Sequence, residues 1–134
     1  MTATRATRTT AETIALFDAA FQAGDTTALA DVVHDDCVMV SAQPAPDGTV
    51  YVGKDACLDF WAELMADPST TFEVEHVFTA DEWAAVRWRY RFGPSDEESV
   101  LGVNVTRVSD GRVIEQLGYT KTPGEVLPLP ELAE

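Results

Sequence analysis

Three segments of the chain carry apolar residues at the three- and four-residue spacing of an amphipathic helix. The first begins after Thr9, an N-cap residue with Glu12 three positions on, and ends at Gly24, which suits a left-handed C-cap. The second covers about residues 26–33, and the third covers residues 53–66. We therefore expect three helices in the first half of the chain.

Six further segments alternate between apolar and polar residues, or are short and β-branched, as strands are. They cover residues 37–42, 49–52, 70–79, 83–92, 100–108 and 112–121. Turn residues separate neighbouring segments, which predicts three antiparallel hairpins. The order is two helices, two strands, one helix and four strands. This order predicts an α+β domain in which a curved antiparallel sheet wraps around the three helices.

The second hairpin has one charged face and one apolar face. A register that sets Glu75 opposite Arg87 brings opposite charges together across the strands. The same register places His76 beside Val86, on the apolar face that must meet the helices. We therefore expect His76 to point into the core.

The third hairpin turns at Ser109, Asp110 and Gly111. A three-residue loop, the register that we favour, sets Asn104 opposite Gln116. A two-residue loop would slip the register by one residue and set Asn104 opposite Leu117 instead. Neither register decides whether the face with Asn104 points inward.

Length, composition and charge exclude several classes of protein. The chain has 134 residues, of which 46% are hydrophobic, so one domain with its own core is expected. The net charge of −14 argues against binding to nucleic acid or to an anionic membrane. The sequence has no membrane-spanning run and no secretory signal, which predicts a cytoplasmic protein. We expect a disordered Thr-rich tail over 1–9, a domain over 10–122 and a Pro-rich tail over 123–134.

Few side chains could carry acid–base chemistry. His76 is the candidate general base because histidine titrates near neutral pH, and the alternative is a core histidine bonded to the backbone. Asn104 and Gln116 could polarise a ligand oxygen, or could bond to each other in the core. Asp18 is offset from Phe17 on the first helix, which predicts that it points to solvent. The sequence has no phosphate loop, zinc-ligand spacing or dinucleotide fingerprint, so we expect no cofactor and no metal.

The ordered set of segments resembles the nuclear transport factor 2-like superfamily, and within it the SnoaL-like polyketide cyclases and the ketosteroid isomerases. The residues that carry this resemblance are FDAAFQAGDTTALADVVHDDCVMV, then VGKDACLDFWAEL, then VTRVSDGRVIEQLGYTK. They match a family pattern of helix, Gly-Asp, helix, an acidic pair entering a strand, Gly plus helix with an aromatic pair, and a final hairpin. The match covers about residues 10–121.

The resemblance implies a cone-shaped half-barrel with a pocket between sheet and helices, and homodimers formed through the outer sheet face. Matched by position, the isomerases' helix tyrosine falls on Phe17, their base on Ser41 and the aspartic acid of their fifth strand on Asn104. Two of these three groups are missing here, so steroid isomerisation is not expected. Family position also implies that Trp61, Trp88 and Phe17 line the pocket.

These observations predict a protein that holds a small apolar ligand, of polyketide-like or terpenoid-like kind. As an enzyme it would be a cofactor-free cyclase, isomerase or hydratase. The predicted catalytic residues are His76, Asn104 and Gln116, and the predicted substrate-binding residues are Phe17, Ser41, Trp61 and Trp88. The alternative is a non-catalytic ligand-binding or dimerisation module on the same fold.

Overall fold

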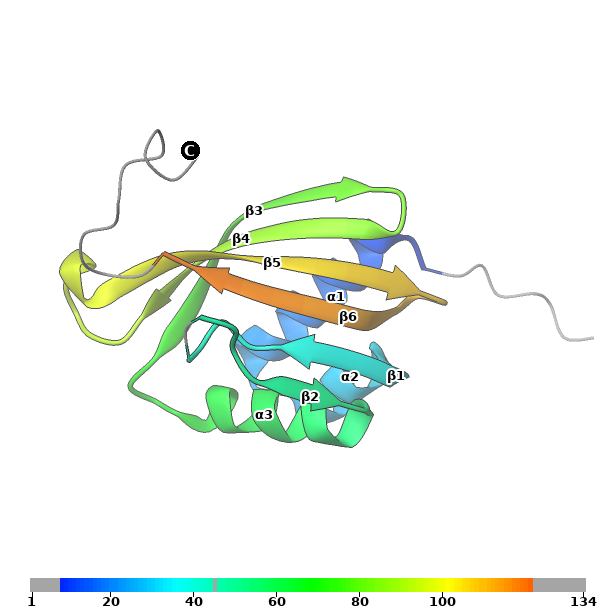
Figure 1. Ribbon diagram of the computed structural model, residues 1–134, viewed down its shortest axis with the longest axis horizontal. Helices are drawn as coiled ribbons and strands as arrows, with labels where there is room; N and C mark the ends of the chain where they lie inside the picture. The colour runs from blue at the N-terminus through cyan, green and yellow to red at the C-terminus, as the bar shows by residue number, and fades with distance from the viewer. Residues whose placement is uncertain (1–7, 45, 122–134) are drawn as a thin grey trace, which may run out of the picture.

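Residues 8–44 and 46–121 are described in a computed structural model of the chain (Figure 1). The predicted C-terminal tail, 123–134, and residues 1–7 of the predicted N-terminal tail lie outside the described residues. Arg8, which also falls in the predicted N-terminal tail, donates a hydrogen bond of 2.8 Å to the Gly111 carbonyl. The folded part of the chain therefore includes Arg8, which lies two residues before the predicted start of the domain at residue 10.

The first helix begins and ends at the residues that the sequence indicates. The Thr9 hydroxyl accepts a hydrogen bond from the Glu12 N–H (3.1 Å), and the Glu12 carboxylate accepts one from the Thr9 N–H (2.9 Å). Gly24 ends the helix with a φ of 66°, as a left-handed C-cap does. The three helices are α1 (Thr10–Ala23), α2 (Thr26–Asp31) and α3 (Lys54–Ala66).

The six strands form one mixed sheet in the order β2-β1-β6-β5-β4-β3. The pairing of β1 with β6 is parallel, so the prediction of a purely antiparallel sheet is wrong at this pair. The other four pairings are antiparallel. The strands are β1 (Val33–Val40), β2 (Val50–Val52), β3 (Thr71–Ala80), β4 (Trp83–Arg91), β5 (Ser99–Ser109) and β6 (Arg112–Thr120), and a 3-10 helix, η1 (Asp96–Glu98), precedes β5.

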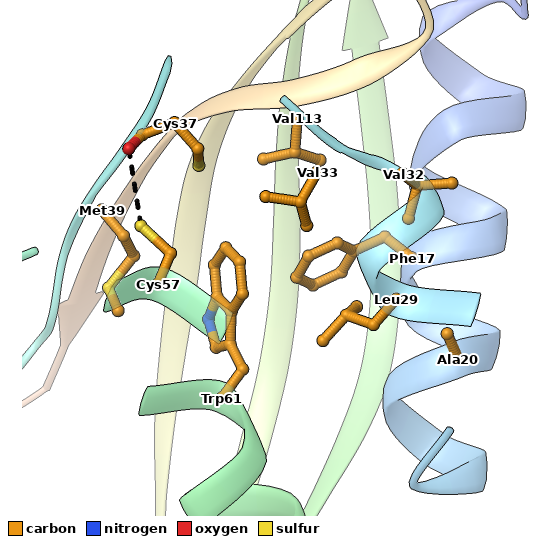
Figure 2. Close-up of a cluster of buried hydrophobic side chains, with 10 residues drawn as sticks. All are labelled: Phe17, Ala20, Leu29, Val32, Val33, Cys37, Met39, Cys57, Trp61 and Val113. Carbon is orange, nitrogen blue, oxygen red and sulfur yellow. Dashed lines mark hydrogen bonds between the residues drawn. The ribbon is translucent and has the colours of Figure 1, made fainter. Parts of the chain in front are cut away.

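The three helices lie together on one side of the curved, open sheet (Figure 1). We call that side of the sheet the inner face and the opposite side the outer face. Figure 2 shows the main core, in which Phe17, Leu29 and Trp61 from the three helices pack with Val33 and Val113 of the sheet. A second cluster joins Ile14 of α1 to four buried residues of β4 and β5, which are Ala84, Val86, Trp88 and Val108. These two clusters cover much of the inner face, while Gly102, Asn104 and Gly118 of the central strands are only partly buried.

The hairpin of β3 and β4 contains a β-bulge that the sequence pattern did not reveal. Val74 pairs with Trp88 as predicted, but His76 pairs with Arg87 because Glu75 is an extra residue in the strand. The extra residue reverses the alternation along the rest of β3. His76 therefore points to the outer face, and the prediction that it points into the core is wrong.

The hairpin of β5 and β6 turns through a two-residue loop, so the favoured three-residue loop is wrong. Ser109 pairs with Arg112, and the loop residues Asp110 and Gly111 have φ angles of 54° and 68°. Positive φ at both positions is the conformation of a type I′ turn. A register shift follows at Val113, where β6 contains an extra residue. The loop and the shift together set the pairing farther along both strands.

Candidate functional site

Two carboxamides from the central strands point toward the helices. Asn104 pairs with Gly118, and Gln116 pairs with Thr106, so neither pairing weighed from the sequence is correct. Asn104 also pairs with Val86, which is buried against α1, and cross-strand partners share a face. Asn104 and Gln116 are therefore diagonal neighbours on the inner face, at a spacing of about 7–8 Å.

Asn104, Thr106 and Gln116 form a group that we call the polar centre. Thr106 is 0% exposed and Gln116 is 6% exposed. The Thr106 hydroxyl is buried without a hydrogen-bond partner among the described residues. Buried polar groups in proteins are nearly always hydrogen-bonded. The polar centre thus contains an unsatisfied hydroxyl at Thr106 next to the partly buried amide of Asn104.

Asp18 of α1 points toward the inner face of the sheet, which was not expected from the sequence. It follows Ile14 by one helical turn and precedes Phe21 by three residues. Ile14 packs on β4 and β5, and the Phe21 ring lies 5.5 Å from the Phe72 ring of β3, so Asp18 lies over the sheet between these contacts. Burial removes water from the carboxylate and raises the pKa of Asp18 to about 6. The prediction that Asp18 points to solvent is therefore wrong.

The helical period was the signal that could have found Asp18. Residues three and four apart on a helix share a face, so Asp18 belongs with Ile14 and Phe21 as much as Phe17 does. For Thr106 the signal was its position in β5, two residues from Asn104 on a strand whose side chains alternate. Thr106 lies between Asn104 and the turn on the same face, and a buried hydroxyl at that position needs a hydrogen-bond partner.

The three aromatic residues expected to line a pocket are all buried on the helix side of the sheet. Phe17 and Trp61 pack edge to face, with ring centroids 5.0 Å apart, inside the main core (Figure 2). Trp88 packs in the second cluster, and its ring lies 5.2 Å from that of Phe72. Phe17 and Trp61 occupy the space between helices and sheet, so their contacts are those of core residues. Their role in ligand binding stays a prediction.

Ser41 lies at the rim of the sheet, beside a hollow of about 360 Å³. Its hydroxyl donates to the Gln43 carbonyl (2.6 Å) and accepts from the Thr49 N–H (3.1 Å). These bonds hold the loop after β1. The hollow forms where β1 ends at Val40 and β6 continues, and it is lined by Val40, Ser41, Ala42, Pro46, Asp47, Gly48, Leu117, Gly118, Tyr119 and Thr120.

The rim hollow adjoins the polar centre through Gly118. A Cβ on Gly118 would lie 3.3 Å from Oδ1 of Asn104 and 3.2 Å from the Ala42 nitrogen, so a larger residue here would crowd the amide. Asn104 itself is only partly buried. A second hollow, of about 410 Å³, lies at the start of α3 and includes none of the predicted site residues.

His76 lies apart from this arrangement. It is exposed on the outer face, where its ring lies 4.3 Å from the ring of Phe78. The thickness of the sheet separates it from Asn104 and Gln116, so these three residues do not converge. Asp18 is a titratable group that the fold brings over the inner face, between the contacts that Ile14 and Phe21 make with the sheet.

The arrangement offers an acid–base group and neutral hydrogen-bond donors on an otherwise apolar surface. A carboxyl with a pKa near 6 can exchange a proton at neutral pH. Carboxamide N–H groups can donate to a carbonyl or enolate oxygen. Within residues 8–44 and 46–121, no three His, Cys, Asp or Glu side chains gather as metal ligands would. In the same ranges, no helix is long and apolar enough to cross a membrane.

Comparison with known proteins places this fold. The chain is 41% identical to an NTF2-like protein from Mesorhizobium loti, with a TM-score of 0.77 over 84% of this chain and 91% of that one. It shares the fold of a candidate polyketide cyclase from Sinorhizobium meliloti (21% identity, TM-score 0.66, 79% of this chain and 92% of that one). It shares it also with a candidate ketosteroid isomerase from Kribbella flavida (18% identity, TM-score 0.72, 91% and 86%). None of the curated proteins compared with the chain matches it.

The family model for the SnoaL-like domain matches residues 14–116. This range includes all three helices, except for the first turn of α1, and runs through the polar centre. With its curved sheet and three helices on the inner face, the chain belongs to the SnoaL-like domain family of the NTF2-like superfamily.

Proposed function

We propose that the protein binds a small, apolar, carbonyl-containing molecule on its inner face and moves a proton on it. Asn104 and Gln116 hold the carbonyl oxygen, and Asp18 exchanges a proton with the carbon beside it. The observation that carries the proposal is the polar centre, where a fully buried Thr106 hydroxyl has no partner among the described residues. An apolar residue at position 106 would avoid the cost of burying an unbonded hydroxyl. The presence of the Thr106 hydroxyl therefore supports a ligand that brings a polar atom to it.

The proposed step needs only groups that the chain supplies. The carboxylate form of Asp18 removes a proton beside the carbonyl, and negative charge develops on the carbonyl oxygen. The amide donors stabilise that charge in a site with little water, where hydrogen bonds are strong. Return of the proton to a different carbon gives isomerisation. Attack of the enolate carbon on a second carbonyl of the same molecule, whose oxygen then takes the proton back from the Asp18 carboxyl, gives ring closure. Either outcome fits the chemistry of a cyclase-like or isomerase-like relative.

The test is exchange of carbon-bound hydrogen for deuterium in flat enolisable ketones, with 2-tetralone as the first probe, followed by NMR in D₂O. The wild type is expected to accelerate the exchange, and Asp18→Asn to lower that acceleration by about 100-fold or more. Asp59→Asn, an exposed position on α3, is the matched control for the loss of one negative charge. Equal acceleration by wild type and Asp18→Asn would contradict the proposed role of Asp18.

A non-catalytic ligand-binding module is the second candidate, and one observation favours it. Phe17 and Trp61 fill the space between α1, α3 and the sheet, and the hollow nearest to the polar centre that is described lies at the rim. Binding of the ketone without accelerated exchange in the wild type would select this candidate. Binding at the same inner face would then be shown by loss of affinity in Asn104→Leu.

We also propose that two copies associate through the outer face. One residue from each strand forms an apolar band that runs straight across the sheet: Val50, Val40, Leu117, Val105, Ala85 and Phe78. Four arginines and three glutamates flank the band and pair with one another, namely Arg87, Arg89, Arg91, Arg107, Glu73, Glu75 and Glu115. This face is therefore nearly neutral in a chain of net charge −14, so two copies can meet there without strong repulsion.

A further inference from the structure

Trp88 carries a buried hydrogen-bond donor that the mechanism above does not use. The residue is 6% exposed, and its Nε1–H has no acceptor among the described residues. A buried donor without an acceptor lowers stability, and native structures rarely retain one. Phenylalanine would fill much of the same apolar space without this cost. The indole therefore calls for an acceptor that comes from outside the described chain.

The indole ring is held in one orientation, so its N–H is aimed in a fixed direction. On one side, the benzene ring of the indole lies over Gly102, where any Cβ would overlap the ring atoms. On another side, the Phe72 ring meets it nearly edge to face, at 73°. A hydroxyl can rotate to find a partner, but an indole held in this way cannot. The direction of the donor is thus a property of the folded sheet.

The position of Trp88 relates it to the polar centre. Trp88 pairs with Gly102, which is two residues from Asn104 along β5, so the two positions are about 7 Å apart along the strand. Both lie on the inner face. The surface near Trp88 is aromatic, because Phe21 and Tyr90 both pack against Phe72. A flat ring system laid along β5 from Asn104 would reach this aromatic end once the side chains that bury Nε1 move aside to admit it.

We infer that Trp88 is a specificity-determining residue whose indole N–H binds a second acceptor oxygen at the far end of the ligand. The ligand class is a flat apolar ring system with one oxygen received by the polar centre and another, an ether, carbonyl or phenol oxygen, received by Trp88. This inference rests on the proposed function, since it assumes a ligand oxygen at Asn104 and Gln116. It adds a requirement on the substrate that the proton transfer does not impose.

The test uses two ligands that differ only in the second oxygen, 6-methoxy-2-tetralone and 6-ethyl-2-tetralone. Each ligand is titrated into the ¹⁵N-labelled wild type while the side-chain N–H signals are followed by NMR. The signals are assigned with variants in which each tryptophan in turn is replaced by phenylalanine, and with Asn104→Leu and Gln116→Leu. The methoxy ligand is expected to move the Trp88 indole signal downfield, and the ethyl ligand is expected not to. Trp83, on the outer face against Arg107, provides the control indole.

Affinity gives a second readout. The ratio of methoxy to ethyl affinity in the wild type, divided by the same ratio in Trp88→Phe, is expected to be roughly 2–10, the value of one hydrogen bond. The inference is overturned if this quotient is one and the Trp88 indole signal does not move, while the amide signals of Asn104 and Gln116 respond to both ligands. In that case the proposed function still stands. If the amide signals respond to neither ligand, the proposed function fails, and this inference fails with it.

Discussion

At the residue scale, the proposed proton transfer depends on the Asp18 carboxylate, which the fold largely shields from water. Among the described residues no opposite charge offsets the burial of Asp18, and desolvation raises its pKa to about 6. A structural carboxylate is normally placed where it can remain charged at low cost. A raised pKa beside unpartnered polar groups is instead typical of functional sites. The same residue should therefore limit stability and supply reactivity.

The pH dependence of stability tests the burial of Asp18 independently of any substrate. A group with a raised pKa favours folding while it is protonated, below its ordinary pKa of 3.8, and that contribution is lost as the pH rises through about 6. Asp18→Asn cannot ionise, so it should gain on the wild type by about 1–2 kcal/mol between pH 5 and pH 8. Urea unfolding at several pH values measures the difference, with Asp59→Asn as control. A constant difference between wild type and Asp18→Asn would show that the carboxylate is solvated.

At the element scale, helix boundaries followed from local sequence, whereas strand faces did not. The capping box at Thr9 and the glycine at Gly24 act within a few residues, so the sequence was sufficient to place α1. The bulge at Glu75 depends on how β3 meets β4, and one extra residue moved His76 to the opposite face of the sheet. Alternation alone cannot reveal such an insertion, because both neighbours of the bulge remain β-formers. For this reason His76, the candidate base, was predicted on the wrong face of the sheet.

The same limit applied to the last hairpin, although there the error did less harm. Asn104 and Gln116 share a face as predicted, because the change of loop length and the extra residue in β6 compensate for each other. Their direct pairing did not survive. The family resemblance predicted the fold correctly, and the candidate site that it implied stays a prediction. The burial of Asp18 and of the Thr106 hydroxyl depends on how helices and sheet pack, so local sequence could not reveal it.

The type I′ turn gives a prediction at this scale. Gly111 has a φ of 68°, and a side chain there would also meet Arg8, so Gly111→Ala should destabilise the protein by about 1–2 kcal/mol. Asp110→Asn should stabilise slightly or be neutral, because Asn-Gly is the preferred sequence of this turn. Ser109→Ala is the control in the adjacent extended position. Thermal or urea unfolding measures all three, and a Gly111→Ala variant as stable as wild type would contradict the two-residue loop.

At the scale of the whole molecule, the two faces of the sheet have different tasks. The inner face meets the helices and carries the polar centre, and the outer face carries the apolar band and its flanking ion pairs. An uncovered apolar band across a whole sheet is typical of an interaction surface. In the proposed dimer, repulsion between exposed acidic groups elsewhere on the surface would direct association to this face.

Leu117→Arg, in the middle of the band, tests the proposed dimer. A buried, unpaired charge at each of two symmetric positions should weaken association by about 100-fold or more, and the variant should sediment as a 14.6 kDa monomer. Leu16→Arg, at an exposed leucine on α1, is the matched control and should leave the dimer intact. A monomeric wild type at about 100 μM would refute the proposal, as would an equal effect of both variants.

The most direct test of the central claim is the pH profile of the ketone exchange reaction. If Asp18 is the base, the exchange rate per enzyme at low ketone concentration should rise with pH and level off above an inflection near pH 6, since the raised pKa sets the fraction of reactive carboxylate. In Asp18→Asn the inflection should disappear together with the acceleration. An inflection that persists in Asp18→Asn, or a wild-type rate with no inflection between pH 5 and pH 7, would contradict the account.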